Sequence, residues 1–175
     1  MKNNLQIVSS LLQLQSGKFA DPTVRDVFTE CRHRINAMAR LHEQLYNEAG
    51  HSHLDFAPHL RELAEMLVRS HTPPDCKLTL HLSADHVPLD LDQCILLSLI
   101  ANELLLNSLK HAFYGRATGK MDAELGATPD RITLTIRDDG IGFVPQPSGM
   151  EKHPGAGMEL VRAMSRQLGG DLVIN

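Results

Sequence analysis

Two long stripes of apolar residues in the first 47 positions most strongly constrain what this chain can fold into. The first stripe has apolar residues at helical spacing, namely Leu5, Val8, Leu11 and Leu12. The segment "SGKFADP" then interrupts the pattern with glycine and proline, which predicts that a first helix ends near Ser16. Asp21 followed by Pro22 is typical of a helix N-cap with proline at the first helical position, so a second helix is expected to begin there.

The second stripe is the longer of the two, and its apolar positions are Val24, Val27, Phe28, Cys31, Ile35, Met38, Leu41 and Leu45. Two long helices joined by a short loop form a helical hairpin. Because the two helices share only one mutual face, a single hairpin cannot bury both wide stripes. The expected completion is a four-helix bundle made from two copies of the hairpin. The alternative is that the hairpin packs onto the rest of its own chain.

After residue 50 the pattern changes to a mixture of helices and strands. Following the polar hinge "AGHSHLD", Asp55 is expected to cap a helix over "FAPHLRELAEMLVRSH", which "TPPD" ends. Leu78, Leu80 and Leu82 alternate in "CKLTLHLS", as they would on one face of a strand. A further helix is expected over residues 91–113, two strands over "GKMDAELGA" and "RITLTIRDDG", a last helix over "GMELVRAMSRQLGG", and the start of another strand at "DLVIN".

This mixture lacks a strict repeat of strand and helix, which predicts an α+β fold with helices on one face of a sheet. The net charge is -4 and no basic block stands out, so nucleic acid is a poor candidate partner. No apolar run reaches the roughly 20 residues that span a membrane, so no membrane contact is expected of this segment. Cys31, Cys76 and Cys94 are scattered singly, which favours buried thiols in a reducing compartment and a cytoplasmic location.

The helix expected over residues 91–113 carries polar side chains at regular intervals in "NELLLNSLKH". They share one edge of the helix because they are spaced by three or four positions: Glu103, Asn107, Lys110 and His111. The oxygen atoms of an acid and an amide suit a magnesium ion, and lysine or histidine offsets the charge of the phosphates that the ion bridges. A solvated polar helix end has a similar composition and is the alternative.

Two glycine-rich segments follow this helix. In "DDGIGF", Gly140 and Gly142 allow the backbone to approach a flat ligand, while Asp138 can accept a hydrogen bond from an exocyclic amine such as that of adenine. A glycine-rich surface turn is the alternative. In "GAGM", the backbone N–H groups of Gly155, Ala156 and Gly157 are expected at a helix N-terminus, where the dipole favours an anion.

The order and spacing of these segments resemble the N-box, G1 and G2 motifs of the GHKL ATPase superfamily, as NExxxNxxKH, DxGxG and GxGxxL. The chain is therefore similar to the ATP-binding domain of a sensor histidine kinase. The resemblance implies that Glu103 helps to activate the attacking group and that Asn107 ligates magnesium. It implies that the other nucleotide-binding residues are Lys110 and His111 at the phosphates, Asp138, Gly140 and Gly142 at adenine, and Gly155, Ala156, Gly157 and Met158 at the start of the last helix, with Val144 to Pro154 as the ATP lid.

The first helices narrow the resemblance further. "KNNLQIVSSLLQLQS" and "RINAMARLHEQLYN" resemble the dimerisation helices of the HisKA_2 histidine kinases, which are related to the HWE group. This implies a dimerising, phosphotransfer-like hairpin over residues 1–50 and a GHKL-type α/β sandwich with ATP and Mg²⁺ over residues 51–175. The implied activity is transfer of the γ-phosphoryl group of ATP to a histidine, and from there to an aspartate in the receiver domain of a response regulator.

Two departures from the family pattern are visible. The family's phosphoacceptor histidine stands in an H-R-x-K-N-N context, and Met1 occupies the x position here, so the acceptor is expected to lie outside this chain. The family also continues beyond "LGGDL" into a last hairpin, so the sandwich is expected to be incomplete after Asn175. The alternative is a dimeric pseudokinase that binds nucleotide and a response regulator without phosphorylating itself. A serine kinase of the anti-sigma type shares the ATP motifs, but the intact "KNNLQ" and "RLHEQLY" helices argue against it.

Overall fold

The computed structural model describes residues 10, 12–14, 21, 28, 31 and 35 and the ranges 53–142 and 156–174. The chain divides into two compact units, residues 1–52 and 53–175, and each is described by itself. In the first unit, the described residues of both predicted helices are helical: Ser10, 12–14, Phe28, Cys31 and Ile35. The rest of the predicted hairpin, and with it the predicted bundle, lies outside the described residues.

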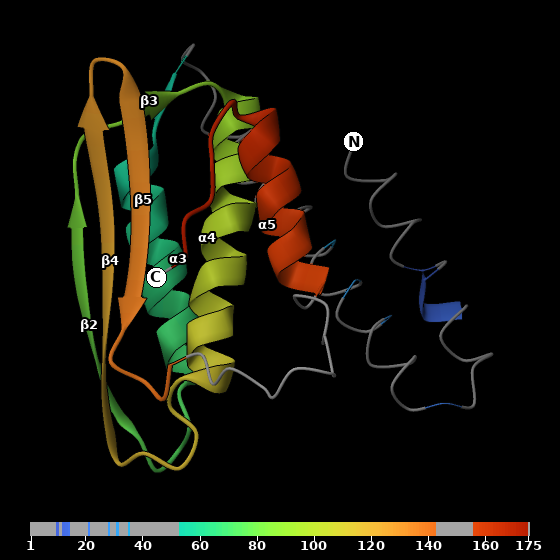
Figure 1. The fold of residues 1–175 in the computed structure, drawn as a ribbon, viewed down its shortest axis with the longest axis vertical. Coiled ribbons are helices and arrows are strands. Elements are labelled where there is room, and N and C mark those ends of the chain that lie inside the picture. The colour runs from blue at the N-terminus through green and yellow to red at the C-terminus, as the bar shows by residue number, and fades with distance from the viewer. Residues whose placement is uncertain are drawn as a thin grey trace. The chain divides into compact units, whose positions relative to one another are not determined.

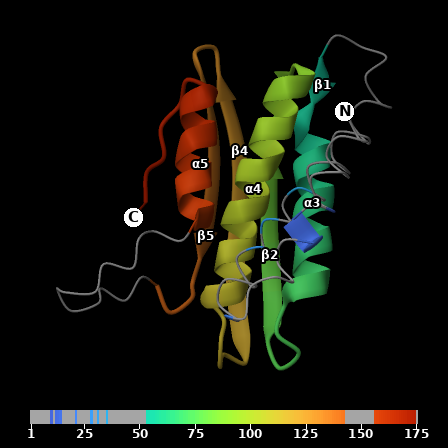
Figure 2. The ribbon, with the colours of Figure 1, turned by 90° about the vertical axis from the view of Figure 1, so that its right-hand side faces the viewer.

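In the second unit, helices cover one face of a mixed sheet, as predicted (Figures 1 and 2). The described helices are α3 (Phe56–His71), α4 (Leu91–His111) and α5 (Ala156–Gln167). The strands of the sheet are β2 (Lys77–Ala84), β4 (Thr118–Thr128) and β5 (Arg131–Asp138), and the short strands β1 (Leu54–Asp55) and β3 (Pro88–Leu89) form a separate antiparallel pair. Figure 2 shows the three helices side by side in front of the sheet, with α4 between the other two.

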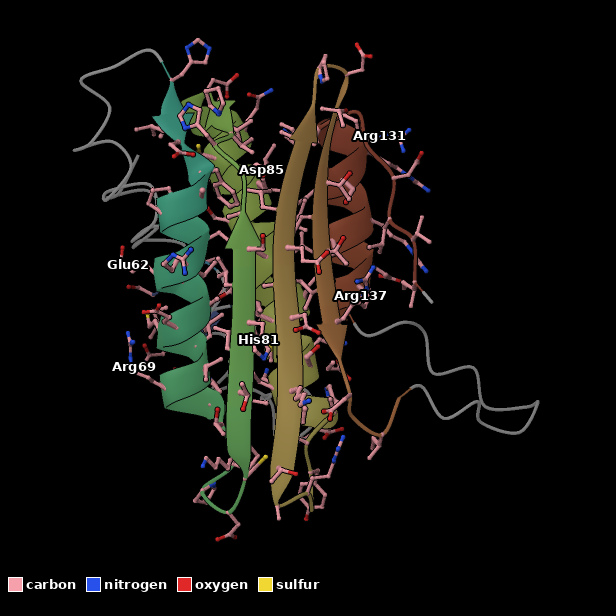
Figure 3. The ribbon with its side chains drawn as sticks, turned by 90° about the vertical axis from the view of Figure 1, so that its left-hand side faces the viewer. Glu62, Arg69, His81, Asp85, Arg131 and Arg137 are labelled. Atoms are coloured by element: carbon pink, nitrogen blue, oxygen red, sulfur yellow. The ribbon has the colours of Figure 1, made fainter. Side chains whose placement is uncertain are left out.

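The sheet has the order β2-β4-β5, with β2 parallel to β4 and β4 antiparallel to β5. Along β4 the side chains alternate as a strand requires, so Met121, Ala123 and Leu125 are buried under the helices while Lys120 and Glu124 are exposed. Figure 3 views the sheet from the side away from the helices, where polar side chains predominate. One sheet face therefore carries the core and the other faces solvent.

Helix α4 lies at the centre of the core because it contacts α3, α5 and the sheet strand β5. Its buried residues consequently occur all around the helix and include Ile95, Leu97, Leu99, Ile100 and Leu105. Helix α3 needs only one apolar face, formed by Phe56, Leu60, Leu63, Ala64 and Leu67. None of the described helices is both long enough and apolar enough to cross a membrane.

The cysteines fit their predicted role as unpaired thiols. All three are free, with Cys76 and Cys94 buried and Cys31 half-buried. Burial, together with the nearby carboxylates of Asp90 and Asp55, raises the pKa of the Cys94 thiol to about 11. This thiol is therefore protonated and unreactive at neutral pH.

The start of each long helix is fixed by an aspartate. Asp55 caps α3 as predicted, accepting hydrogen bonds from the backbone N–H groups of Ala57 and Val87, both at 3.1 Å. Its other oxygen lies 3.0 Å from Nδ1 of His86. Burial raises the pKa of Asp55, but these hydrogen bonds outweigh it and the pKa lies below its ordinary value. Asp90 forms a capping box with Gln93 at the start of α4, the helix that carries the candidate site.

Two boundary predictions need correction. Helix α4 ends at His111 rather than Phe113, because Phe113 turns into the core and Gly115 takes a positive φ of 73°. The strand expected from Asp171 is wrong: residues 171–174 form no strand in the structure. A strand needs a hydrogen-bonded neighbour, and the described part of the chain offers this segment none in register, so Val173 and Ile174 are exposed.

Candidate functional site

The four polar residues predicted to share a helix edge all lie in the second half of α4. Glu103 is buried, with 9% of its surface exposed, and Asn107 is half-buried. One turn further on, Lys110 and His111 are exposed. Along this edge a buried carboxylate is followed by a half-buried amide and then by exposed nitrogen groups. This series of side chains suits a charged ligand that brings a metal ion to the oxygen atoms.

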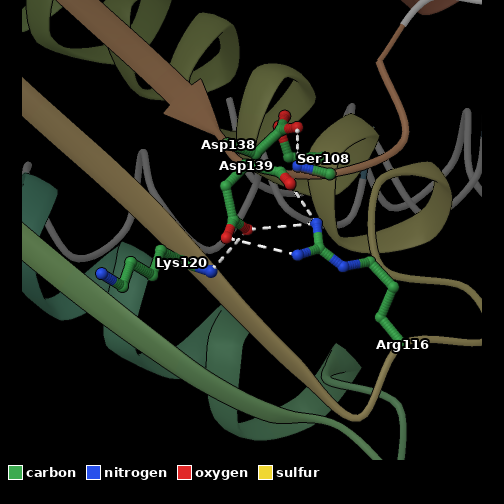
Figure 4. Close-up of polar contacts among 6 residues, drawn as sticks. Ser108, Arg116, Lys120, Asp138 and Asp139 are labelled. Carbon is green, nitrogen blue, oxygen red and sulfur yellow. Dashed lines mark hydrogen bonds and ion pairs between the residues drawn. The ribbon is translucent and has the colours of Figure 1, made fainter.

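The end of β5 brings a second predicted residue to this helix. The Oγ of Ser108, directly after Asn107, donates a 2.7 Å hydrogen bond to Oδ2 of Asp138 (Figure 4). The backbone N–H of Gly140 donates to the other oxygen, Oδ1, at 3.1 Å. The structure thus joins the second half of α4 to the turn at residues 138–142, two features that are about 30 residues apart in the sequence.

The adjacent carboxylate points elsewhere and holds the turn in place. Asp139 accepts a 2.8 Å hydrogen bond from the backbone N–H of Lys120, and its oxygens lie 3.3 Å from the guanidinium nitrogens of Arg116 (Figure 4). The guanidinium also donates to the main-chain carbonyl of Asp139. The hydrogen bond from Lys120 and the charge of Arg116 hold the pKa of the Asp139 carboxyl below its ordinary value. This carboxylate therefore remains charged and anchors the turn to the start of β4.

The two glycines of the turn stand where a side chain would be unfavourable. A Cβ atom on Gly140 would lie 2.3 Å from the Cβ of Ala112 and 2.6 Å from its carbonyl oxygen, so only glycine fits against the end of α4. The next residue, Ile141, donates a 3.1 Å backbone hydrogen bond to the same carbonyl. Gly142 has a φ of 68°, a left-handed conformation that favours glycine. The backbone of the turn therefore packs directly against the C-terminal end of α4.

The third predicted segment is described only in part. Ala156 is the first residue of α5, and Gly157 and Met158 lie in its first turn, with Gly157 half-buried and Met158 buried. Gly155 and the expected lid from Val144 to Pro154 lie outside the described residues. Helix α5 packs against α4, so the first turn of α5 belongs to the same helical layer as the polar edge.

Sequence reasoning missed the residues that connect these segments. Three residues outside the turn contact it, namely Ser108, Ala112 and Arg116. Within the turn, Asp139 is the partner of Arg116. A partial signal existed, because Ser108 directly follows Asn107 and Asp139 directly follows Asp138. The pairings themselves depend on the packing of β5 against α4, which no local pattern encodes.

The helices over one sheet face, with Glu103, Asn107, Lys110 and His111 on α4 and the turn that begins at Asp138 beside its end, fit the class of histidine kinase-like ATPase domains, which the sequence motifs resemble. The sequence profile of the histidine kinase-like ATPase domain family, HATPase_c_2, matches residues 62–170, and that of the HisKA_2 histidine kinases matches residues 1–71. The chain therefore belongs to the histidine kinase-like ATPase domain family, and its first 71 residues match the HisKA_2 histidine kinase family, as the sequence motifs predicted.

The chain is also similar in sequence to known histidine kinases. Over 98% of its length the chain is 27% identical to the sensor histidine kinase PdtaS of Mycobacterium tuberculosis, of which it covers 34%. It is 23% identical to blue-light-activated histidine kinase 2 of Erythrobacter litoralis, of which it covers 50%. The chain thus spans between a third and a half of these relatives.

A solved structure confirms the predicted fold class. The histidine kinase domain of the blue-light-activated histidine kinase EL346 of Erythrobacter litoralis superposes with a TM-score of 0.69. The match covers 97% of this chain and 89% of that one, at 19% sequence identity. An α/β sandwich of the histidine kinase-like ATPase type is therefore the fold that this similarity supports.

Proposed function

We propose that this chain is the core of a two-component histidine kinase, in which residues 51–175 bind ATP with Mg²⁺ and residues 1–50 form the dimerisation hairpin. The division of the chain into compact units at residues 52 and 53 supports this boundary. The observation that carries the proposal is the hydrogen bond between Ser108 and Asp138, because it ties the helix turn that carries Asn107 to the Asp-Gly turn. The family of ATPase domains to which the chain belongs supports the same assignment.

The chemistry of the site fits a purine nucleotide that carries an amine. Each oxygen of Asp138 already accepts one hydrogen bond, and a carboxylate offers further lone pairs that can only accept. The carboxylate is exposed, so a ligand can reach it. A ligand group that meets it must be a donor, and the exocyclic amine of adenine is such a group.

The donor set also fits magnesium held together with phosphates. Asn107 offers an amide oxygen and Glu103 a carboxylate on the same edge of α4. Within the described ranges, no group of three His, Cys, Asp or Glu side chains could hold a metal ion by itself. Magnesium in nucleotide sites commonly takes only one or two protein ligands and completes its shell with phosphate oxygens and water, so Asn107 is the proposed ligand.

In the proposed reaction, a histidine nitrogen attacks the γ-phosphorus, a phosphorus–nitrogen bond forms, and the bond to the β-phosphate oxygen breaks to release ADP. Asn107 would hold magnesium, which would supply positive charge beside the phosphates. In this proposal Glu103 accepts the proton of the attacking group, and Lys110 and His111 offset phosphate charge. Positioning and electrostatic stabilisation supply most of the catalysis in such transfers. The phosphoryl group would then pass to an aspartate in the receiver domain of a response regulator.

None of the ten histidines of this sequence stands in the H-R-x-K-N-N context of the family's acceptor. We therefore propose the phosphoryl transfer for a kinase that carries this acceptor, and ATP binding for the residues of this sequence. ATP binding does not depend on the acceptor, so binding is the property by which this chain tests the proposal.

Replacing Asn107 by alanine is expected to weaken ATP binding only when magnesium is present. The substitution removes one oxygen ligand of the metal, which should lower the affinity for the ATP–magnesium complex by about tenfold or more. Calorimetric titration of ATP into the wild type and the variant, with magnesium and with EDTA, measures this. Equal affinities of the two proteins in EDTA are the internal control, and equal affinities in magnesium would show that Asn107 is not a ligand.

The hairpin is expected to hold two chains together. Leu12 and Ile35 lie on the two apolar stripes and are half-buried. Replacing either residue with glutamate or lysine should place a charge in an apolar bundle core and convert a dimer at tens of micromolar into a monomer. Sedimentation velocity measures this, with Gln13→Glu as the control because Gln13 is exposed and off the stripe. A monomeric wild-type chain would contradict dimerisation through the hairpin.

A further inference from the structure

Ser108 differs from Ser70, Ser98 and the α3 C-cap residue Thr72 in where its hydrogen bond goes. Ser70, Thr72 and Ser98 each donate to the backbone carbonyl four residues earlier, at 2.8, 2.6 and 2.6 Å. This local bond is the usual choice for serine and threonine in a helix. Ser108 instead donates across to Asp138, 30 residues further along the chain. Because this buried hydroxyl bonds to Asp138 and not to a carbonyl of its own helix, we look for a requirement at the Asp138 carboxylate.

That requirement is the orientation of the Asp138 carboxylate. Ser108 is buried, with 8% of its surface exposed, whereas Asp138 is exposed. The bond to Oδ1 comes from the backbone of Gly140, within the same turn as Asp138. The hydrogen bond from Ser108 is the one that ties the carboxylate directly to a side chain of α4.

We propose that Ser108 is a positioning residue that sets the preference of this site for an amine-bearing purine such as adenine. Its hydroxyl proton occupies one acceptor position on Oδ2, so the carboxylate is held with its remaining acceptor positions toward the ligand. The inference rests on the proposed function, because it needs a nucleotide whose amine meets Asp138.

The position of Ser108 in α4 gives this role a further consequence. It directly follows Asn107, the proposed magnesium ligand, in the same turn of helix. One rigid element therefore sets both the distance to the phosphates and the direction of the base-reading carboxylate. One turn of α4 would then act on the nucleotide at its phosphates, through Asn107, and at its base, through Ser108 and Asp138.

The test compares Ser108→Ala with the wild type in the full 175-residue chain, using ATP and purine riboside triphosphate. The second ligand has hydrogen in place of the 6-amino group and is otherwise the same. A hydrogen bond to a charged group is commonly a tenfold effect or more, so the wild type should prefer ATP by at least about tenfold. Ser108→Ala should reduce this preference to less than about threefold, with less than about a twofold change in affinity for the ligand without the amine.

Ser98→Ala is the matched control, because it removes a buried hydroxyl from the same helix without touching the turn at residues 138–142. It should keep the wild-type preference. Because the preference is a ratio measured on one protein sample, a partly unfolded fraction lowers both binding signals and leaves the ratio unchanged.

The outcomes separate this inference from the proposed function. If Ser108→Ala keeps the full preference for ATP, or loses affinity for both ligands equally, the positioning role is wrong while ATP binding stands. If the wild type itself binds both ligands equally, Asp138 does not read the amine, and the base-recognition part of the proposed function fails as well.

Discussion

Replacing Asp138 by asparagine is expected to remove most of the ATP affinity of this chain and leave its fold nearly intact. The carboxylate accepts hydrogen bonds from Ser108 and from the backbone of Gly140, and it is proposed to accept a third from the adenine amine. An asparagine side chain exchanges one acceptor oxygen for an NH₂ donor, so one of these donors must face another donor. An unpaired polar group of this kind costs about 1–3 kcal/mol, which corresponds to a loss of about fivefold to about 150-fold in affinity.

Calorimetric titration of ATP measures this loss, and circular dichroism with thermal unfolding reports on the fold. Asp122→Asn is the matched control because Asp122 lies on β4, with its side chain on the sheet face away from the helices. It should bind ATP as the wild type does. If Asp138→Asn also kept the wild-type affinity, the turn at residues 138–142 would not be the base-binding part of the site.

A second large effect is expected from Gly140→Ala, which should both destabilise the domain and abolish ATP binding. The new Cβ would lie 2.3, 2.6 and 2.7 Å from the Cβ, carbonyl oxygen and Cα of Ala112. Two of these atoms belong to the backbone of Ala112, the C-cap residue of α4, so they cannot move aside as a flexible side chain could. Overpacking of this kind costs about 1–3 kcal/mol and should lower the melting temperature by several degrees.

The loss of binding should exceed what the loss of stability explains. Moving the turn away from Ala112 breaks the 3.1 Å backbone hydrogen bond from Ile141 and shifts the Asp138 carboxylate from Ser108. Gly126→Ala is the control, since its nearest neighbour would be an oxygen of Asp85 at 3.9 Å, an ordinary contact. A Gly140→Ala protein with wild-type melting temperature and ATP affinity would show that the close approach of the turn to α4 is not needed.

The parts of the site that lie on one element could be predicted from the sequence. The spacing of Glu103, Asn107 and His111 places them on one helix edge whatever the tertiary structure, because the helical repeat alone decides it. Asp55 and its "LDF" context likewise predicted the cap that begins α3. The alternation of leucines in β2 and the mixed order of elements were sufficient for the fold class.

Contacts between elements could not be predicted in this way. The bonds from Ser108 to Asp138 and from Arg116 to Asp139 join residues 30 and 23 positions apart, and they form only because β5 packs against the end of α4. The error at residues 171–174 has the same origin: an apolar run has strand propensity, but a strand exists only where a neighbour supplies its hydrogen bonds. The missed contacts of Ser108 and Arg116 and the wrong strand at residues 171–174 therefore have one cause, which is pairing between segments far apart in the sequence.

The most direct test of ATP binding is a calorimetric titration of the 175-residue chain with ATP, in magnesium and in EDTA. We expect saturable binding of one ATP per chain that is clearly tighter with magnesium, and no comparable binding of GTP, whose 6-oxo group would face the acceptor oxygens of Asp138. Absence of saturable ATP binding in magnesium, or equal binding of GTP, would contradict the assignment of this site.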